Sequence, residues 1–323
     1  MIADWPHNTP INHPITKSPD YPIRPVRPLL KWAGGKRQLL PEIRRFYPRD
    51  FVRYIEPFVG SGAVFFDLHA TGRLGGHEVI LVDSNADLIG CYETVRDRHA
   101  DVARALSALA DAHAREPRRH YYDVRDRAFN PMRDRLRGAD GRIAYTPELA
   151  AMFIYLNRTG FNGLFRVNRR GGFNVPAGRY DRPRIADASR LAAVAEALSN
   201  PRVRLEWGSF EAVRAMATAG DFLYIDPPYA PLSRTANFTS YTRTPFEAAD
   251  QRSLHALVVD LARRGCQVLL SNSTADEIAA LYQNDAARAA GLRALRVPAR
   301  RAINSNGARR GAVDEFLITN IPV

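Results

Sequence analysis

The residues best suited to chemistry lie in Asp221–Leu232, which has the sequence DFLYIDPPYAPL. Its apolar and aromatic run FLYI has the composition of a short buried strand that would end at Asp226. Pro227 and Pro228 cannot donate hydrogen bonds to a sheet, so the chain must leave the sheet there. We therefore expect Asp226, the carbonyl of Pro227 and the ring of Tyr229 to be held rigidly at the sheet edge where open α/β sheets bind ligands.

These groups are suited to the activation of an aromatic amine. The exocyclic amino group of adenine is a poor nucleophile because its lone pair is delocalised into the ring. Asp226 and the carbonyl of Pro227 can each accept a hydrogen bond from it, which favours a tetrahedral nitrogen whose lone pair faces a methylsulfonium. Tyr229 would stack on the base, which must first rotate out of the duplex. We therefore expect Asp226, Pro227, Pro228 and Tyr229 to form a catalytic motif.

A second motif, EPFVGSG at Glu56–Gly62, has the pattern of a nucleotide-binding turn between a strand at 52–56 and a following helix. Gly60 and Gly62 allow the backbone to approach a ligand, and the start of the next helix presents free N–H groups. A dinucleotide enzyme would need a third glycine where this chain has Phe65. The motif therefore indicates a nucleoside ligand without phosphates.

Asp83 supplies the other half of the expected cofactor site. It ends a predicted strand at 79–82, about 20 residues beyond the glycine turn, where a carboxylate can bind ribose hydroxyls. Together with the amine chemistry expected at Asp226, this arrangement predicts S-adenosylmethionine as the cofactor. Because the sulfonium already activates the methyl group, we expect no metal.

The two cysteines exclude one alternative reaction. Methylation of cytosine C5 needs a cysteine nucleophile, commonly after proline, whereas Cys91 and Cys266 each follow glycine. Two cysteines also provide neither a disulfide framework nor a metal cluster, which fits a reducing cytoplasm. The sequence shows no signal peptide and no long apolar segment, so we expect no membrane association.

The chain is strongly basic, with 46 Lys and Arg against 34 Asp and Glu and a formal net charge of +12. Arginine dominates the excess, and its planar group can bond a phosphate or a guanine through two parallel hydrogen bonds. Double-stranded DNA is therefore the expected partner, and we expect a monomer in the cytoplasm, associated with the nucleoid. A basic surface that only keeps the protein in solution is the alternative.

Alternating strands and helices predict an α/β fold with a doubly wound, mostly parallel sheet. An apolar fraction of 46% over 323 residues is enough for one large domain with an insertion. Further strands are expected at 203–207, 266–271, 293–297 and 316–319. The predicted organisation is a flexible proline-rich tail at 1–28, a cofactor-binding first part of the catalytic domain at 29–85, a target-recognition insertion at 86–186 and a second catalytic part at 187–323.

The predicted insertion begins with helices and continues into a segment at 156–183 in which Arg, Asn, Gly and aromatic residues alternate without helical periodicity. This pattern is typical of an exposed hairpin or loop, and its side chains suit DNA. A solvated basic hairpin with inward-facing aromatics is the alternative. A second basic loop, at 300–316, is expected to contact the DNA backbone. The candidate DNA contacts in the first segment are Arg158, Arg166, Arg169, Arg170, Arg179, Asn162, Asn168, Phe161 and Phe173.

From Leu29 onward the chain resembles the Dam-type DNA adenine-N6 methyltransferases of the α motif order. The resemblance is carried by LLKWAGGK, EPFVGSG, the acidic strand end at Asp83, LNRTGFNGLFRVN, FNVPAGRY, DPPYAPLSRTANFTSY and INSNGARRGAVDEFL. It implies that Trp32, Lys36, Asp83 and Asp226 contact the cofactor. It also implies that the cofactor turn is formed by Glu56, Pro57, Phe58, Gly60 and Gly62.

The resemblance further implies adenine in GATC as the target. By motif, Lys31 would contact the first guanine and Arg166 the guanine opposite the last cytosine, while Leu164 and Pro176 would touch the central pairs. The family usually has tyrosine where this chain has Phe161. Phenylalanine keeps the ring that wedges into the base stack but loses a hydroxyl, so flipping or contacts to the orphaned base are expected to differ.

Other functions remain open at this point. The enzyme could methylate adenine by the same chemistry in a different target sequence. A non-catalytic, basic DNA-organising protein is another, and there Asp226 would be dispensable. A methyltransferase of protein amides or RNA could use a similar motif, although asparagine is more usual at its first position for amide substrates.

Overall fold

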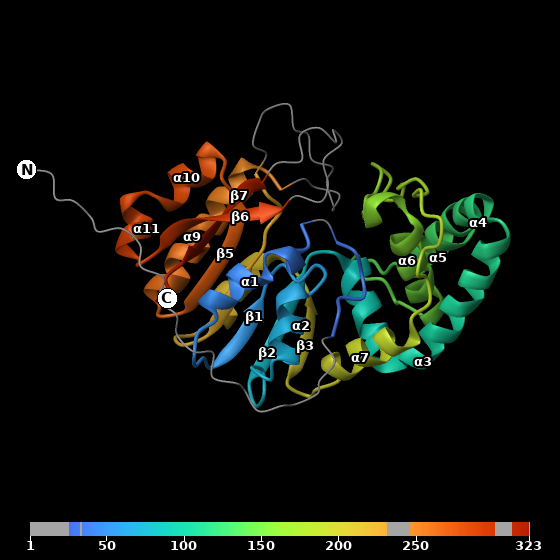
Figure 1. The fold of residues 1–323 in the computed structure, drawn as a ribbon, viewed down its shortest axis with the longest axis horizontal. Coiled ribbons are helices and arrows are strands. Elements are labelled where there is room, and N and C mark those ends of the chain that lie inside the picture. The colour runs from blue at the N-terminus through green and yellow to red at the C-terminus, as the bar shows by residue number, and fades with distance from the viewer. Residues whose placement is uncertain (1–25, 33, 231–245, 301–311, 323) are drawn as a thin grey trace, which may run out of the picture.

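The computed structural model describes residues 26–32, 34–230, 246–300 and 312–322. Most of the expected tail at 1–28 and most of the expected basic loop at 300–316 lie outside the described residues. The remainder contains a sheet with helices on both faces and a set of inserted helices beside it (Figure 1).

The seven-stranded sheet has the order β3-β2-β1-β4-β5-β7-β6. Neighbouring strands among β1 to β5 are parallel, whereas β7 is antiparallel to both β5 and β6. This mixed, mostly parallel sheet confirms the predicted fold class. The strands are β1 (Arg53–Glu56), β2 (Glu78–Asp83), β3 (Val203–Trp207), β4 (Phe222–Ile225), β5 (Gln267–Ser273), β6 (Arg293–Arg300) and β7 (Ala312–Thr319).

The strand order reverses between β1 and β4. From β1 the sheet continues outward through β2 to β3, and from β4 it continues outward through β5 in the other direction. Such a reversal leaves a crevice at the carboxyl ends of the two central strands, where α/β proteins bind ligands. Glu56 ends β1 and Asp226 follows β4, so the two predicted motifs meet at this crevice.

Successive side chains of the central strands point to opposite faces of the sheet, which divides the core into two layers. Tyr54 and Phe222 belong to a layer that continues without a break into the inserted helices. Ile55 and Leu223, the next residues along each strand, belong to a second layer that is completed by α9 and α10. The inserted helices therefore share a core with one face of the sheet.

The helices of the catalytic part are mostly short. The segment after Gly35 forms η1 (Lys36–Gln38), α1 (Leu40–Ile43) and η2 (Arg44–Phe46). The others are α2 (Ala63–Ala70), α7 (Ala188–Leu198), η5 (Phe210–Ala212), α8 (Val213–Met216), α9 (Ala248–Arg263), α10 (Asp276–Tyr282) and α11 (Asp285–Ala289). None of the described helices has both the length and the apolar character needed to span a membrane.

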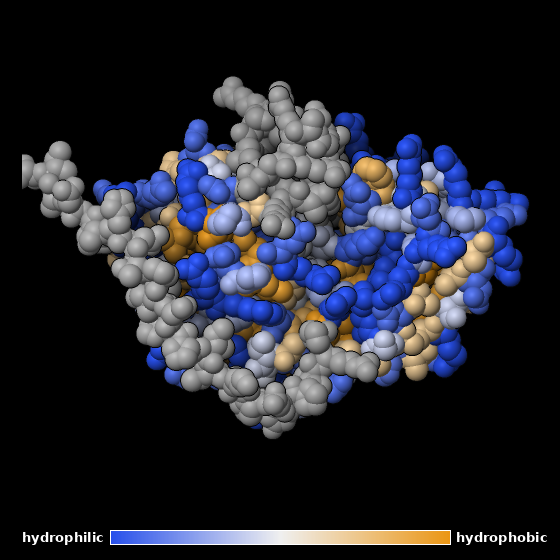
Figure 2. All heavy atoms as spheres, in the orientation of Figure 1, coloured by the Kyte–Doolittle hydropathy of each residue, from blue (hydrophilic) through white to orange (hydrophobic). Residues whose placement is uncertain are grey.

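The insertion is helical up to a hairpin, as predicted. Pro117, Pro131 and Pro147 lie in the first turns of three helices, where a missing N–H costs nothing. Hydrophilic residues predominate over the outer surface of these helices in the view of Figure 2. The elements are α3 (Ala86–Arg115), α4 (Pro117–Asp123), the π-helical η3 (Val124–Phe129), α5 (Asn130–Arg135), α6 (Pro147–Thr159) and η4 (Phe161–Gly163).

The segment after α6 folds back as an irregular hairpin. Val167 pairs with Phe173, and Gly160 pairs with Ala177, through isolated antiparallel bridges. At the tip, Oδ1 of Asn168 accepts hydrogen bonds from two backbone N–H groups of the turn. The prediction of a hairpin or loop in this region is therefore confirmed.

Candidate active site

Asp226 lies at the reversal point of the sheet with one carboxylate oxygen anchored. Its side chain is 19% exposed, and Oδ1 lies 2.7 Å from Nζ of Lys36. The hydroxyl of Ser271 on β5 donates to the same oxygen at 3.0 Å. Within the described residues, Oδ2 has no hydrogen-bond partner. Burial raises the pKa of Asp226, and Lys36 and Ser271 oppose that shift.

The backbone after Asp226 is held by buried polar side chains. Nε2 of Gln251 donates to the carbonyl of Pro228 at 3.0 Å, and the hydroxyl of Ser273 donates to the carbonyl of Ala230 at 2.7 Å. No described group donates to the carbonyl of Pro227. The fixed backbone therefore presents one carbonyl that is available to a ligand, next to the available oxygen of Asp226.

The ring of Tyr229 is partly exposed and is contacted at two points. Its hydroxyl donates to Oε2 of Glu315 on β7 at 2.7 Å, and Nζ of Lys36 lies 4.6 Å from the ring centroid. Burial, reinforced by the charges of Asp226 and Glu315, raises the pKa of the Tyr229 hydroxyl well above its usual value. The phenol therefore remains a hydrogen-bond donor at neutral pH.

The glycine turn and the end of β2 are joined by the carboxylate of Asp83. Its Oδ2 accepts from the backbone N–H of Gly60 at 3.0 Å, and its Oδ1 accepts from that of Asn85 at 2.9 Å. Burial raises the pKa of Asp83 to about 6, although both backbone hydrogen bonds oppose the shift. The two parts of the predicted cofactor site are therefore in direct contact.

Trp32 closes the glycine turn on one side. Gly60 has a φ of +47°, and a Cβ there would lie 2.8 Å from Cδ1 of the Trp32 ring, so only glycine fits. The same indole is stacked on Phe165 of the insertion, with a centroid distance of 6.0 Å. Trp32 thus connects the predicted cofactor turn with the predicted DNA-binding hairpin.

The first residues of the turn lie deeper in the protein. Glu56 is buried and accepts a hydrogen bond from the Tyr54 hydroxyl at 2.7 Å; burial raises its pKa well above the usual value for a glutamate. Pro57 is also buried. Phe58 is partly buried and stacks on Phe210, with a centroid distance of 5.3 Å. Of these three side chains, Phe58 is thus the most accessible.

Lys31 is held beside the end of α6 by a residue that the sequence did not single out. Oδ1 of Asn157 accepts from the backbone N–H of Lys31 at 2.8 Å, and its Nδ2 donates to the carbonyls of Lys31 and Gly163. A Cβ at Gly163 would lie 2.4 Å from that of Lys31, so the two segments approach too closely for another residue. Nζ of Lys31 lies 4.2 Å from the ring centroid of Tyr180, another residue that sequence reasoning missed.

The exposed tip next to Lys31 contains Phe161 and Asn162. Phe161 is 48% exposed, which is unusual for an aromatic side chain in this fold, and Asn162 has a left-handed backbone with a φ of +54°. Leu164 is partly buried and Pro176 is exposed; the carbonyl of Pro176 accepts from the N–H of Phe161 at 2.9 Å. These four predicted DNA contacts therefore lie together.

Arg166 is oriented by its hairpin partner. Its Nε donates to Oδ1 of Asn174 at 2.8 Å, across the hairpin. Arg169, Arg170 and Arg179 are exposed. All four arginines remain accessible to a ligand on this side of the insertion.

Two of the predicted DNA contacts are buried in this structure. Arg158 is 7% exposed, in the last turn of α6, and donates to the carbonyls of Leu29 and Arg184 at 2.6 and 3.1 Å. Phe173 is 3% exposed and lies among other aromatic rings, with Phe165 at a centroid distance of 5.6 Å. Arg158 fastens the insertion to the segment that contains Leu29, and Phe173 packs against Phe129 and Phe165 in the aromatic core under the hairpin.

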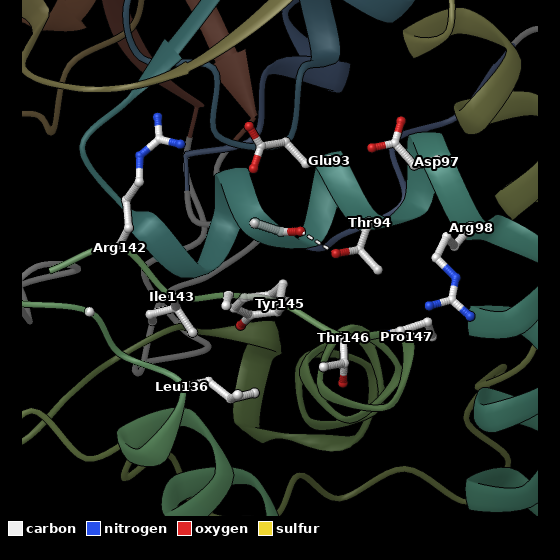
Figure 3. Close-up of a pocket in the computed structure, with 13 residues that line it drawn as sticks. Glu93, Thr94, Asp97, Arg98, Leu136, Arg142, Ile143, Tyr145, Thr146 and Pro147 are labelled. Carbon is white, nitrogen blue, oxygen red and sulfur yellow. Dashed lines mark hydrogen bonds between the residues drawn. The ribbon is translucent and has the colours of Figure 1, made fainter. Parts of the chain in front are cut away.

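A separate cleft of about 550 Å³ lies within the insertion, between α3 and the segment before α6 (Figure 3). Charged side chains on its rim include Glu93, Asp97 and Arg142. It contains none of the predicted catalytic, cofactor-binding or DNA-binding residues, and is therefore distinct from the site at the end of β4.

Comparison with known proteins agrees with this geometry. Residues 32–303 match the family described as D12 class N6 adenine-specific DNA methyltransferase. The chain is 37% identical over 298 residues to the type II methyltransferase M1.LlaDCHI of Lactococcus lactis subsp. cremoris, covering 91% of this chain and 95% of that protein. It is 39% identical over 306 residues to the type II methyltransferase M.MjaIII of Methanocaldococcus jannaschii, covering 91% and 99%.

The chain is also 38% identical over 294 residues to the DNA adenine methylase of Escherichia coli K12, covering 90% of this chain and 94% of that protein. The matches extend over both parts of the sheet and over the insertion between them. With the DPPY motif at the reversal point of the sheet, they show that this chain belongs to the D12 class of N6 adenine-specific DNA methyltransferases.

Proposed function

We propose that this enzyme transfers the methyl group of S-adenosylmethionine to N6 of an adenine rotated out of duplex DNA, and that its target sequence is GATC. One observation carries the chemistry. At the end of β4, polar side chains occupy Oδ1 of Asp226 and the carbonyls of Pro228 and Ala230, while Oδ2 of Asp226 and the carbonyl of Pro227 have no partner among the described residues.

These two acceptors act together on the amino group of adenine. Each accepts one N–H, which withdraws the nitrogen lone pair from conjugation with the ring and leaves it directed away from both acceptors. Pro227 has no N–H that would compete for them. Tyr229 stacks on the base, and the charge of Lys36 favours the ionised, acceptor-only form of Asp226. When bound, S-adenosylmethionine supplies a methyl group that its sulfonium charge already activates.

The residues around the glycine turn fit a nucleoside. The left-handed glycines Gly60 and Gly62 bring the backbone close to the end of β2, and Asp83 supplies a carboxylate for ribose hydroxyls. Nδ2 of Asn85, beside Asp83, is buried and has no hydrogen-bond partner within the described residues. Trp32 provides an aromatic wall for the cofactor.

The insertion at 86–186 is assigned to target recognition. Phe161 and Asn162, both exposed, would enter the base stack, and Lys31 and Arg166 would read guanines at the two ends of the target. Leu164 and Pro176, whose backbones are hydrogen-bonded to Phe161, would touch the central pairs. Arg169, Arg170 and Arg179 would contact the DNA backbone.

Expression in a bacterial host without adenine methylation tests both the reaction and the target. Sequencing of the genomic DNA with detection of modified bases should show N6-methyladenine in GATC, and DNA from cells with the Asp226→Ala variant should show none. A lack of methyladenine with the unchanged protein would contradict the reaction. Methyladenine in another sequence would contradict only the target.

A different adenine target is the second candidate. The chain is as similar to the two type II methyltransferases as to the DNA adenine methylase, so overall identity does not distinguish targets. The same sequencing experiment decides between them, because it reports the bases that flank each methyladenine.

A further inference from the structure

Glu315 lies on β7 and faces the DPPY motif. Its Oε2 accepts the hydrogen bond from the Tyr229 hydroxyl at 2.7 Å, and it forms no ion pair with a described residue. The pKa of Asp226, which is raised mainly by burial, is raised further by the charge of Glu315. A carboxylate at this position therefore repels both Asp226 and an approaching DNA strand. Among the described residues, the hydrogen bond from the Tyr229 hydroxyl is the contact that offsets this repulsion.

The pairing of β5 with β7 determines where Glu315 lies. Its cross-strand partner is Ser273, whose hydroxyl donates to the carbonyl of Ala230. One cross-strand pair therefore fastens the backbone directly after Tyr229 and also the far end of its ring. The neighbouring residue on β7, Asp314, is exposed, as the alternation of a strand requires.

A rigid backbone alone does not fix an aromatic side chain, because its side-chain torsions remain free. The two contacts described above remove that freedom: Nζ of Lys36 lies over the face of the Tyr229 ring and Glu315 binds its tip. A hydrogen bond from a phenol to a carboxylate is short and directional, so it fixes the position of the hydroxyl and with it the direction of the ring axis. Lys36, over one face, restricts rotation of the ring about that axis.

We propose that Glu315 is a positioning residue, which holds the ring of Tyr229 in the position where the target adenine stacks on it. The assignment rests on the proposed role of Tyr229 in stacking on the adenine. Glu315 touches neither base nor cofactor in this account and acts only through the tyrosine hydroxyl. Its loss should therefore slow methyl transfer and leave cofactor affinity unchanged.

A double-mutant cycle tests this coupling. The single-turnover rate of methyl transfer is measured for Glu315→Ala, Tyr229→Phe and the double variant. The assay uses saturating S-adenosylmethionine and a duplex that contains the unmethylated target sequence. Each single variant should slow transfer about tenfold, because each removes the same hydrogen bond. The double variant should be no slower than the slower single variant, and S-adenosylmethionine should bind all variants with unchanged affinity.

Two further variants separate positioning from general effects. Glu315→Gln retains an acceptor for the Tyr229 hydroxyl and should recover most of the rate, even if Glu315→Ala fails to fold. Asp314→Ala removes a carboxylate from the adjacent, exposed position and should leave the rate unchanged, which controls for the loss of negative charge.

Additive losses in the cycle, or a Glu315→Gln variant as slow as Glu315→Ala, would overturn the assignment. Failure of the proposed function would give different results. The unchanged enzyme would then transfer no methyl group to adenine, or the Asp226→Ala variant would remain active.

Discussion

Nζ of Lys36 and Oδ1 of Asp226, 2.7 Å apart, form an ion pair that joins the start of the catalytic domain to the DPPY motif. Lys36 is 5% exposed and also donates to the carbonyl of Gly34 at 2.5 Å. Burial raises the pKa of Asp226, and this lysine opposes the rise. Lys36 therefore favours the ionised form of this carboxylate.

Replacement Lys36→Met should shift the acidic limb of the pH–rate profile to higher pH. Without its cation, the buried carboxylate has a higher pKa, and activity is lost as the pH falls through that pKa because a protonated Asp226 accepts fewer hydrogen bonds. The measurement is the single-turnover rate with saturating DNA and S-adenosylmethionine between about pH 5 and pH 9. Lys31→Met, a lysine proposed to contact DNA, is the matched control. An unmoved limb in Lys36→Met would contradict the role of the ion pair.

Cofactor affinity should weaken in acid because of Asp83. Its pKa of about 6 lies above the usual 3.8, so it is ionised above pH 6 and becomes protonated below it. The protonated group loses part of its capacity to accept hydrogen bonds, and the affinity should fall by up to about tenfold per pH unit below pH 6. Calorimetric titration of S-adenosylmethionine from neutral pH down to pH 5 measures this. An affinity that stays constant down to pH 5 would show that no ionised carboxylate is needed.

Substitution of two arginines in the insertion should have different effects, one on sequence preference and the other on stability. Arg166→Ala should cost roughly 1–3 kcal/mol of discrimination at one base pair and leave the melting temperature unchanged. Arg158→Ala removes two buried hydrogen bonds and should lower the free energy of unfolding by roughly 2–4 kcal/mol, with no change in sequence preference. Chemical denaturation and methylation of duplexes with single substitutions measure the two effects. Equal losses on all duplexes for Arg166→Ala would instead indicate a phosphate contact.

Ser271 should contribute to the rate through the orientation of Asp226. It is fully buried, donates to Oδ1 at 3.0 Å and lies 3.2 Å from the hydroxyl of Tyr224. Ser271→Ala should slow single-turnover methyl transfer about tenfold while DNA binding is retained. Ser199→Ala, which removes a similar hydroxyl at the end of α7, is the control. Equal rates for the two variants would exclude an orienting role for Ser271.

The sequence was sufficient to place Asp226 and Asp83. Each follows a short apolar run, and Asp226 is followed by two prolines and Asp83 by Ser84 and Asn85, so the local pattern indicates where each strand ends. Their approach at one edge follows from the rules of parallel sheets. The pairing of β7 between β5 and β6 had no such local signal, because it depends on a strand that returns antiparallel from the end of the chain.

Side-chain direction accounts for what the sequence could not show. Arg158 and Arg166 lie in the same basic segment, but Arg158 belongs to the last turn of a helix and is directed toward the carbonyl of Leu29, which is distant in sequence. Ser271 and Glu315 are ordinary strand residues until the register of β5 with β4 and β7 is known. Phe173 was assigned to the wrong side of the hairpin for the same reason.

Methyl transfer by the purified enzyme tests the central claim most directly. The enzyme is incubated with S-adenosylmethionine and a duplex containing one GATC site, and the nucleosides are then identified by mass spectrometry. The unchanged enzyme should produce N6-methyldeoxyadenosine, and Asp226→Ala, at saturating cofactor, should be slower by at least about 100-fold. A methyl group on any other atom, or an Asp226→Ala variant as fast as the unchanged enzyme, would contradict the assignment of Asp226 and Pro227 to the activation of the adenine amine.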